Sequence, residues 1–124
     1  MLITTLHYHQ RSKTLDIHFD NGDSAELSAE FLRVHSPSAE VQGHHQSEPN
    51  LVTNKRDVGI NKIEPVGHYA VRLIFDDGHL SGLYSFRYLA ELTSNKDNLW
   101  QSYLARLKAA NAQRDASIAI KVTP

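Results

Sequence analysis

One stretch of alternating apolar residues constrains the fold more than any other part of the chain. Val71, Leu73 and Phe75 recur at every second position, as one buried face of a β-strand requires. Asp-Asp-Gly at 76–78 then indicates a tight turn, because Gly78 can adopt a positive φ without steric cost. Residues 80–84 are predicted to run back as a partner strand, and Ser85 to cap a short helix.

The same order of signals occurs earlier in the chain. Residues 3–19 are predicted to form a β-hairpin, followed by a turn at 20–22, a strand at 24–27 and a helical turn capped by Ser28. The matched positions are Phe19 to Gly22 with Phe75 to Gly78, Leu27 with Leu83, Ser28 with Ser85 and Leu32 with Leu89. This indicates two copies of a hairpin–cap–helix unit. The alternative is that capped hairpins resemble one another without any duplication.

The remaining segments complete a prediction of the α+β class. Residues 34–57 show no periodicity, which is typical of a functional or disordered loop, and residues 58–66 suggest an edge strand that tolerates Pro65. Asp97 is predicted to cap a final amphipathic helix that packs on the core. Antiparallel hairpins packed with short helices are therefore expected over 1–114, with 115–124 as a tail that pairs as a strand or frays.

Composition excludes several classes of function. A net charge of −1 disfavours nucleic acid and anionic membranes as partners. The absence of cysteine excludes disulfides, thiolate zinc sites and Cys-ligated iron–sulfur clusters. No apolar run approaches the roughly 20 residues that span a bilayer, and the N-terminus lacks the features of a signal peptide. A cytoplasmic location is expected.

Eight histidines raise the question of a metal site. His7 and His9 share one face of a predicted strand, and antiparallel pairing could bring Asp16 or His18 across from them. A solvated sheet face that contains histidines by chance is the favoured interpretation, because the pattern does not fix three convergent ligands. The His-x-Asp spacing of residues 18–20 is better explained by the turn than by an oxygenase iron site.

Signals for catalysis are weak. The chain has no Gly-rich phosphate loop and no Gly-x-Ser-x-Gly motif. The carboxylates are scattered, and the Asp76, Asp77 and His79 cluster is the sole group that could support a small enzyme. We therefore expect a protein that is not an enzyme.

Two segments carry a recognisable pattern. The first runs from Phe31-Leu32-Arg33 through Val41 with Gly43-His44 after it, and the second is Asp77-Gly78-His79-Leu80-Ser81-Gly82-Leu83-Tyr84-Ser85-Phe86. With Phe75-Asp76, they resemble the N-terminal domain of gamma-butyrobetaine hydroxylase and the small stand-alone bacterial proteins similar to it. The resemblance covers residues 5–92. The hydroxylase's catalytic domain has no counterpart in this sequence.

The resemblance implies a structural zinc site whose ligands have changed here. In the hydroxylases three cysteines follow a Trp-Leu-Arg motif, and the histidine of Asp-Gly-His is the fourth ligand. Ser36, Ser38 and Val41 stand in place of the cysteines, and His79 alone is retained. Serine and valine cannot replace thiolates, so no metal and no cofactor are expected. The two regions should still meet, with His79 facing Ser36, Ser38 or His35.

The function expected from these observations is a small non-catalytic binding or protein-interaction module. A similar domain is attached to P-loop ATPases of iron–sulfur cluster assembly, which implies an accessory role and a protein partner in that metal-cofactor pathway. The candidate binding residues are Arg33, His35, Ser36, Ser38, His44, Asp77 and His79. One alternative is an iron or zinc protein that uses His79 with His35 or His44. A second is the small enzyme centred on residues 76–79.

Overall fold

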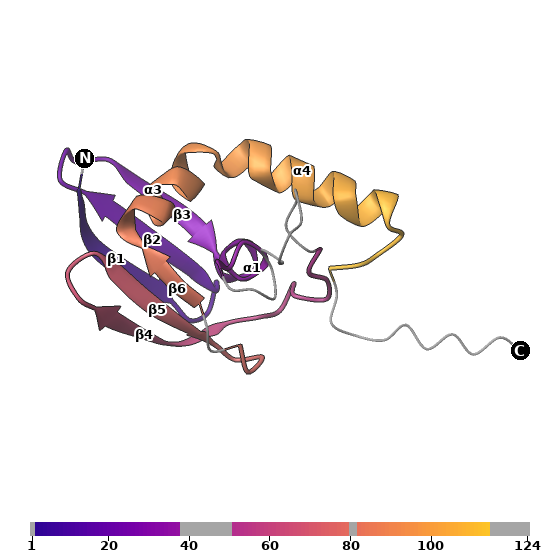
Figure 1. Cartoon of the computed structure of the whole chain (residues 1–124), viewed down its shortest axis with the longest axis horizontal. Helices are drawn as coiled ribbons and strands as arrows, with labels where there is room; N and C mark the ends of the chain where they lie inside the picture. The colour runs from indigo at the N-terminus through magenta and orange to yellow at the C-terminus, as the bar shows by residue number, and fades with distance from the viewer. Residues whose placement is uncertain (1, 38–50, 80–81, 115–124) are drawn as a thin grey trace, which may run out of the picture.

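The computed structural model describes residues 2–37, 51–79 and 82–114 (Figure 1). Within these ranges, two three-stranded antiparallel sheets and three helices make up an α+β fold, as the sequence predicts. Sheet A has the order β1-β2-β3 and sheet B the order β4-β5-β6. The strands are β1 (Ile3–His9), β2 (Thr14–Phe19), β3 (Ser24–Ser28), β4 (Ile60–Val66), β5 (Ala70–Phe75) and β6 (Gly82–Ser85), and the helices are α1 (Ala29–Val34), α3 (Phe86–Ser94) and α4 (Lys96–Ala109).

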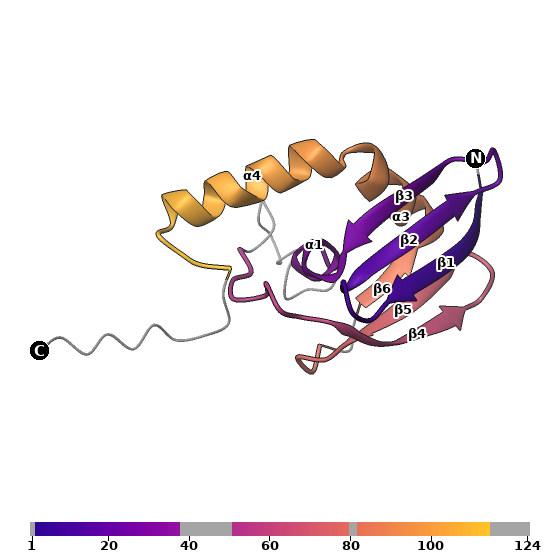
Figure 2. The same ribbon diagram turned by 180° about the vertical axis from the view of Figure 1, so that it is seen from behind.

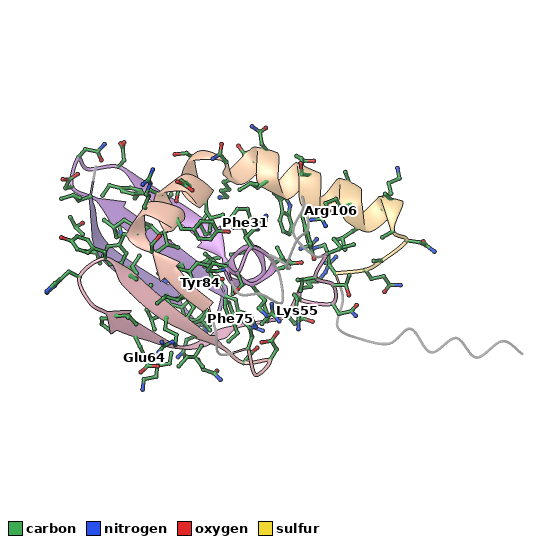
Figure 3. All side chains as sticks on the ribbon, viewed as in Figure 1. Phe31, Lys55, Glu64, Phe75, Tyr84 and Arg106 are labelled. Atoms are coloured by element: carbon green, nitrogen blue, oxygen red, sulfur yellow. The ribbon has the colours of Figure 1, made fainter. Side chains whose placement is uncertain are left out.

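The main core lies between the inner faces of the two sheets. Period-two alternation directs apolar side chains of both central strands inward, so that Leu15 and Ile17 of β2 meet Leu73 and Phe75 of β5 in one cluster. Figure 3 shows Phe75 and Tyr84 among the side chains that fill this space, while Glu64 lies at the outer side of β4. The predicted buried face of β5 is therefore confirmed.

The two sheets are built alike, which confirms the repeated unit as architecture. Both first strands carry an irregularity after their first pair, which is Ile3 with Phe19 in sheet A and Ile60 with Phe75 in sheet B. Both third strands end at a serine whose hydroxyl accepts the N-cap bond at 3.0 Å, from the amide of Phe31 or of Tyr88. The equivalence therefore extends to the helices, where residue 29 corresponds to residue 86.

One correspondence expected from the sequence is wrong. The register pairs Leu27 with Leu15 in sheet A and Tyr84 with Val71 in sheet B, so Tyr84 is the counterpart of Leu27. Leu83 is 44% exposed, whereas Tyr84 is fully buried. The segment from the turn glycine to the capping serine is one residue longer in the second unit. The extra residue therefore lies before position 84, and residues 82–84 shift by one position relative to the simple alignment, whereas Ser85 keeps its match with Ser28.

Each of the short helices packs against the sheet of the other unit. The Tyr84 hydroxyl of β6 donates a hydrogen bond to the carbonyl of Leu32 in α1. Correspondingly, α3 follows sheet B but contacts β3 of sheet A. The start of β4 approaches β1 (Figures 1 and 2), where the Tyr8 hydroxyl accepts from the amide of Ile60 at 2.9 Å.

Helix α4 begins earlier than the sequence suggested. Asn95, not Asp97, is its N-cap residue, and Asp97 lies within the first turn. Asn95 also ends α3, so one residue terminates one helix and starts the next. Tyr103 and Leu107 of α4 are buried in a second cluster with Val34 and Val52. The apolar stripe of α4 is thus packed, as predicted, although its partners are α1 and the segment before β4.

No helix within the described ranges is long and apolar enough to cross a membrane.

Residues 51–57, the described part of the expected loop, contain neither helix nor strand. The predictions for the 115–124 tail concern residues outside the described part of the chain.

The turn at Gly78 leads to a first testable prediction. Gly78 has a φ of 89°, and a Cβ added there would meet no atom within 4 Å. Gly78→Val is therefore expected to cost about 1–3 kcal/mol of unfolding free energy through backbone strain alone. Chemical denaturation measures this cost. Gly78→Asn is the control, because asparagine adopts positive φ more readily than valine. An unchanged melting curve for the valine variant would contradict the prediction.

Candidate functional site

The retained histidine of the family motif lies against the loop after α1. The Nε2 atom of His79 and the Oγ atom of Ser36 are joined by a hydrogen bond of 2.8 Å. Both side chains are buried, with exposed fractions of 7% and zero. The backbone amide of His79 also donates to Oδ1 of Asp77 at 3.1 Å. The predicted proximity of the two regions is thus present, with Ser36 as the partner of His79.

The carboxylate of Asp77 lies between two cations. Its Oδ2 accepts from Nε of Arg33 at 2.9 Å and from Nζ of Lys55 at 2.6 Å. Burial acts to raise the pKa of Asp77, but hydrogen bonds from Lys55, the His79 amide and Arg33 outweigh it and lower the pKa to about 2. Asp77 is therefore ionised at neutral pH and serves as the counter-ion of Arg33, whose side chain is 3% exposed.

His35 faces away from this pair. Its Nδ1 atom is bonded to the carbonyl of Phe31 at 2.8 Å, and its ring packs on the rings of Phe31 and Tyr103. Burial lowers the pKa of His35, which keeps the ring uncharged at neutral pH. The structure thus brings Arg33 to Asp77 and Ser36 to His79, but it directs His35 elsewhere. Ser38 and His44 lie outside the described residues.

A separate apolar cleft lies at the other end of the sheets, near the start of β1. It has a volume of about 570 Å³, within the range of about 300–1,000 Å³ typical of ligand pockets. Tyr69, which is 79% exposed, and Leu2, which is 69% exposed, form part of its wall. The lining residues are Leu2, Ile3, His68, Tyr69, Ser85, Phe86, Arg87 and Ala90.

Comparison with known protein families assigns the chain. The family model described as gamma-butyrobetaine hydroxylase-like, N-terminal matches residues 6–90, which is more than half of the sequence. The chain belongs to this family. The resemblance read from the sequence is thereby confirmed. No curated protein matches the chain.

Solved structures of similar proteins have the same fold. Two solution structures determined by NMR are 52% and 48% identical to this chain, with TM-scores of 0.80 and 0.81. Each covers 99% of this chain, which in turn covers 93% and 98% of theirs. A crystal structure from Acidithiobacillus ferrooxidans, described as a protein with unknown function of the DUF971 family, is 32% identical with a TM-score of 0.63. It covers 74% of this chain, which covers 92% of that chain.

The zinc that membership of the hydroxylase-like family implies does not fit the residues present here. Of the two described ligand positions, Ser36 offers a hydroxyl, and this hydroxyl is already bonded to Nε2 of His79. Ser38 and Val41 occupy the other two positions in the sequence. A structural zinc site requires thiolate, imidazole or carboxylate ligands. In this member of the family, the Ser36–His79 hydrogen bond joins the two segments.

Sequence reasoning missed two parts of the arrangement. Lys55, the second cation on Asp77, lies in the segment without periodicity, where no local pattern marks it. The apolar cleft combines the start of β1, the β4–β5 turn and the start of α3. The sequence does not show that Leu2 and Tyr69 are exposed, and single exposed apolar residues are in any case common on protein surfaces.

Proposed function

We propose that this hydroxylase-like domain is a non-catalytic protein-interaction module that takes an apolar polypeptide segment of a partner in the cleft at the start of α3. One observation carries the proposal. The equivalent surface of the first unit is covered by segments of the chain itself that contain neither helix nor strand, whereas the cleft in the second unit is open. The segments that cover the first unit therefore indicate what kind of segment would bind in the open cleft.

The equivalence of the two surfaces rests on matched backbone hydrogen bonds. The amide of Ala29 donates to the carbonyl of Lys13 at 2.8 Å, and the amide of Phe86 donates to the carbonyl of Tyr69 at 2.7 Å. A second pair of hydrogen bonds also matches. The backbone amide of Asp20 donates to the carbonyl of Leu2 at 2.8 Å, and that of Asp76 donates to the carbonyl of Gly59 at 2.9 Å. The cleft wall contains Leu2, Tyr69 and Phe86. Their equivalents on the surface of the first unit are, in the same order, Gly59, Lys13 and Ala29.

In the first unit that surface is covered by two irregular segments of the chain. The segments 54–56 and 113–114 are joined by backbone hydrogen bonds of 2.9 and 2.7 Å. Nζ of Lys13 donates to the carbonyl of Asp57, and Arg114 donates to both oxygens of Glu30 at 2.9 and 2.7 Å. All six residues of α1 are buried.

In the second unit the matching residues are open to solvent. Arg87, the counterpart of Glu30, has a side chain that is 91% exposed, and its described ion pair is a long one with Glu91 at 3.6 Å. Exposed pairs of this kind contribute about 0.3–0.5 kcal/mol, so Arg87 can exchange Glu91 for a carboxylate of an incoming segment. The apolar lining of the cleft fits apolar side chains, and by analogy with the Glu30–Arg114 pair the occupant carries an acidic residue beside them.

The polar cluster at residues 76–79 gives less support to the rival functions. Asp77 is ionised and engaged by two cations, so it is a poor proton acceptor at neutral pH. His79 is bonded to Ser36, and His35 is bonded to Phe31. We therefore assign this cluster a structural role. Because similar domains are attached to iron–sulfur assembly ATPases, we propose proteins of that pathway as the first full-length partners to test.

Selection of binding peptides tests the function. We expect random octapeptides displayed on phage and selected on the purified protein to converge on apolar residues beside Asp or Glu. The best synthetic peptide should shift the amide resonances of Tyr69, Phe86 and Ala90. Tyr69→Ala should weaken its binding about tenfold or more, because exposed aromatic residues at the centre of an interface carry much of the affinity.

Leu83→Ala is the matched control, because Leu83 is another exposed apolar residue and lies outside the cleft. It should leave peptide affinity unchanged. The proposal is wrong if selection gives no enrichment, if the peptide shifts resonances away from the cleft, or if the Tyr69 and Leu83 variants bind equally well.

A further inference from the structure

A compact group of metal-ligating side chains lies on the outer face of sheet A, the face seen in Figure 2. His7 and His9 are alternate residues of β1 and therefore point to the same side. The strand register places Asp16 of β2 directly opposite His7. One ligand atom from each of the three side chains lies within 4.8 Å of the other two. The sequence pattern alone left the third ligand undetermined, and the register supplies it.

The three side chains are in contact but remain adjustable. Nε2 of His9 lies 2.7 Å from Oδ2 of Asp16, and the imidazole rings of His7 and His9 are 4.3 Å apart. The His9 and Asp16 side chains are 41% and 27% exposed. Two ligand atoms bound to one ion at about 2.1 Å can be no more than about 4.2 Å apart. Small side-chain rotations therefore suffice to close the group around an ion, while the paired strands hold the backbone in place.

The donor set selects a class of ion. Two imidazole nitrogens and one carboxylate oxygen suit zinc, nickel, copper or iron, whereas calcium and magnesium favour oxygen ligands throughout. Three protein ligands leave coordination positions for water, because the site faces solvent. His18 and Glu26 lie on the same face beside Asp16, where they pair with Ser24 and Asp16 respectively in the β2–β3 register.

We propose that His7, His9 and Asp16 form a surface site for one divalent transition-metal ion of the zinc class. This site is separate from Ser36 and His79, and it lies on the outer face of sheet A, away from the apolar cleft. The proposal is therefore independent of peptide binding. An ion there joins β1, an edge strand of sheet A, to the central strand β2 through side chains as well as backbone.

Titration of the tag-free protein with zinc chloride tests the site. We expect saturable binding of one ion per chain by calorimetry, with the ring resonances of His7 and His9 shifting together in NMR spectra. His7→Asn and His9→Asn should each weaken binding about tenfold or more. These side chains are at least partly exposed, so both variants should fold, which circular dichroism verifies.

His18→Asn is the matched control, because it removes an imidazole from the same sheet face but not from the cluster. It should bind zinc like the unaltered protein. Absence of saturable binding would overturn the proposal. So would unchanged binding by the His7→Asn/His9→Asn double variant, or zinc-dependent shifts confined to His35 or His79.

Discussion

Replacing Asp77 with alanine is expected to lower the free energy of unfolding by about 3 kcal/mol. The variant leaves the buried guanidinium of Arg33 without the carboxylate that now lies 2.9 Å from its Nε. It also removes the acceptor of the His79 amide. The estimate is at the lower end of the range for breaking a buried ion pair, because the Asp77 side chain is itself 18% exposed. Urea denaturation at pH 7 measures the difference.

The pH dependence provides a signature that is specific to this carboxylate. The folded pKa of Asp77 is lowered from 3.8 to about 2, so its stabilisation is fully present above about pH 4 and is lost as pH falls toward 2. The difference between the unaltered protein and Asp77→Ala should shrink over the same interval. Asp76→Ala removes the same charge from the neighbouring residue and should cost much less. Equal costs for the two variants, or a difference that persists undiminished at pH 2, would contradict this interpretation.

Replacing Tyr84 with alanine is expected to cost about 3–5 kcal/mol, the usual range for removing a buried large aromatic side chain. Tyr84 is fully buried between the sheets and α1. Its hydroxyl donates to the carbonyl of Leu32, and burial raises the pKa of Tyr84 well above its ordinary value, so the hydroxyl remains a donor. Thermal and urea denaturation give the loss of stability.

The adjacent residue provides the control. Leu83 is 44% exposed, so Leu83→Ala should change stability by no more than about 0.5 kcal/mol. Tyr84→Phe keeps the ring and removes the hydroxyl, and should cost about 1–3 kcal/mol because the Leu32 carbonyl loses its donor. A larger cost for Leu83→Ala than for Tyr84→Ala would show that the register of β6 is shifted by one residue.

The sequence predicted those elements whose signals are local. The Asp-Asp-Gly turn, the serine caps and the alternation in β5 each depend on neighbouring residues, and each is present in the structure. The helix start at Asn95 was missed because Asn and Asp are about equally favoured as N-cap residues, so residue type alone does not choose between positions 95 and 97. Asn95 also makes no capping bond with its side chain. Leu83 was aligned with Leu27 because both are leucines, although burial depends on strand register.

The contacts at the candidate site also fall into those that the sequence predicted and those that it did not. The proximity of Ser36 and His79 followed from the family resemblance, which relates two segments that are 43 residues apart. Lys55 and Asp77 are 22 residues apart, and the resemblance contains no motif that relates them. The third member of the cluster with His7 and His9 is Asp16, because Asp16 is the residue of β2 that pairs with His7. Alternation along a strand does not determine which residues pair across strands. Long-range pairing is thus the part that a single sequence conveys least well.

The exchange of helices between the two units has a consequence for how the molecule unfolds. The hydrogen bonds that fasten α1 to β6 and to α3 join residues 52 and 53 positions apart, through the hydroxyls of Tyr84 and Tyr88. Neither sheet therefore keeps its cover when the other is lost, and the repeat does not divide the protein into halves that open separately. Amide hydrogens at the centres of β2 and β5 should therefore give the same free energy of opening in hydrogen exchange, equal to that of global unfolding.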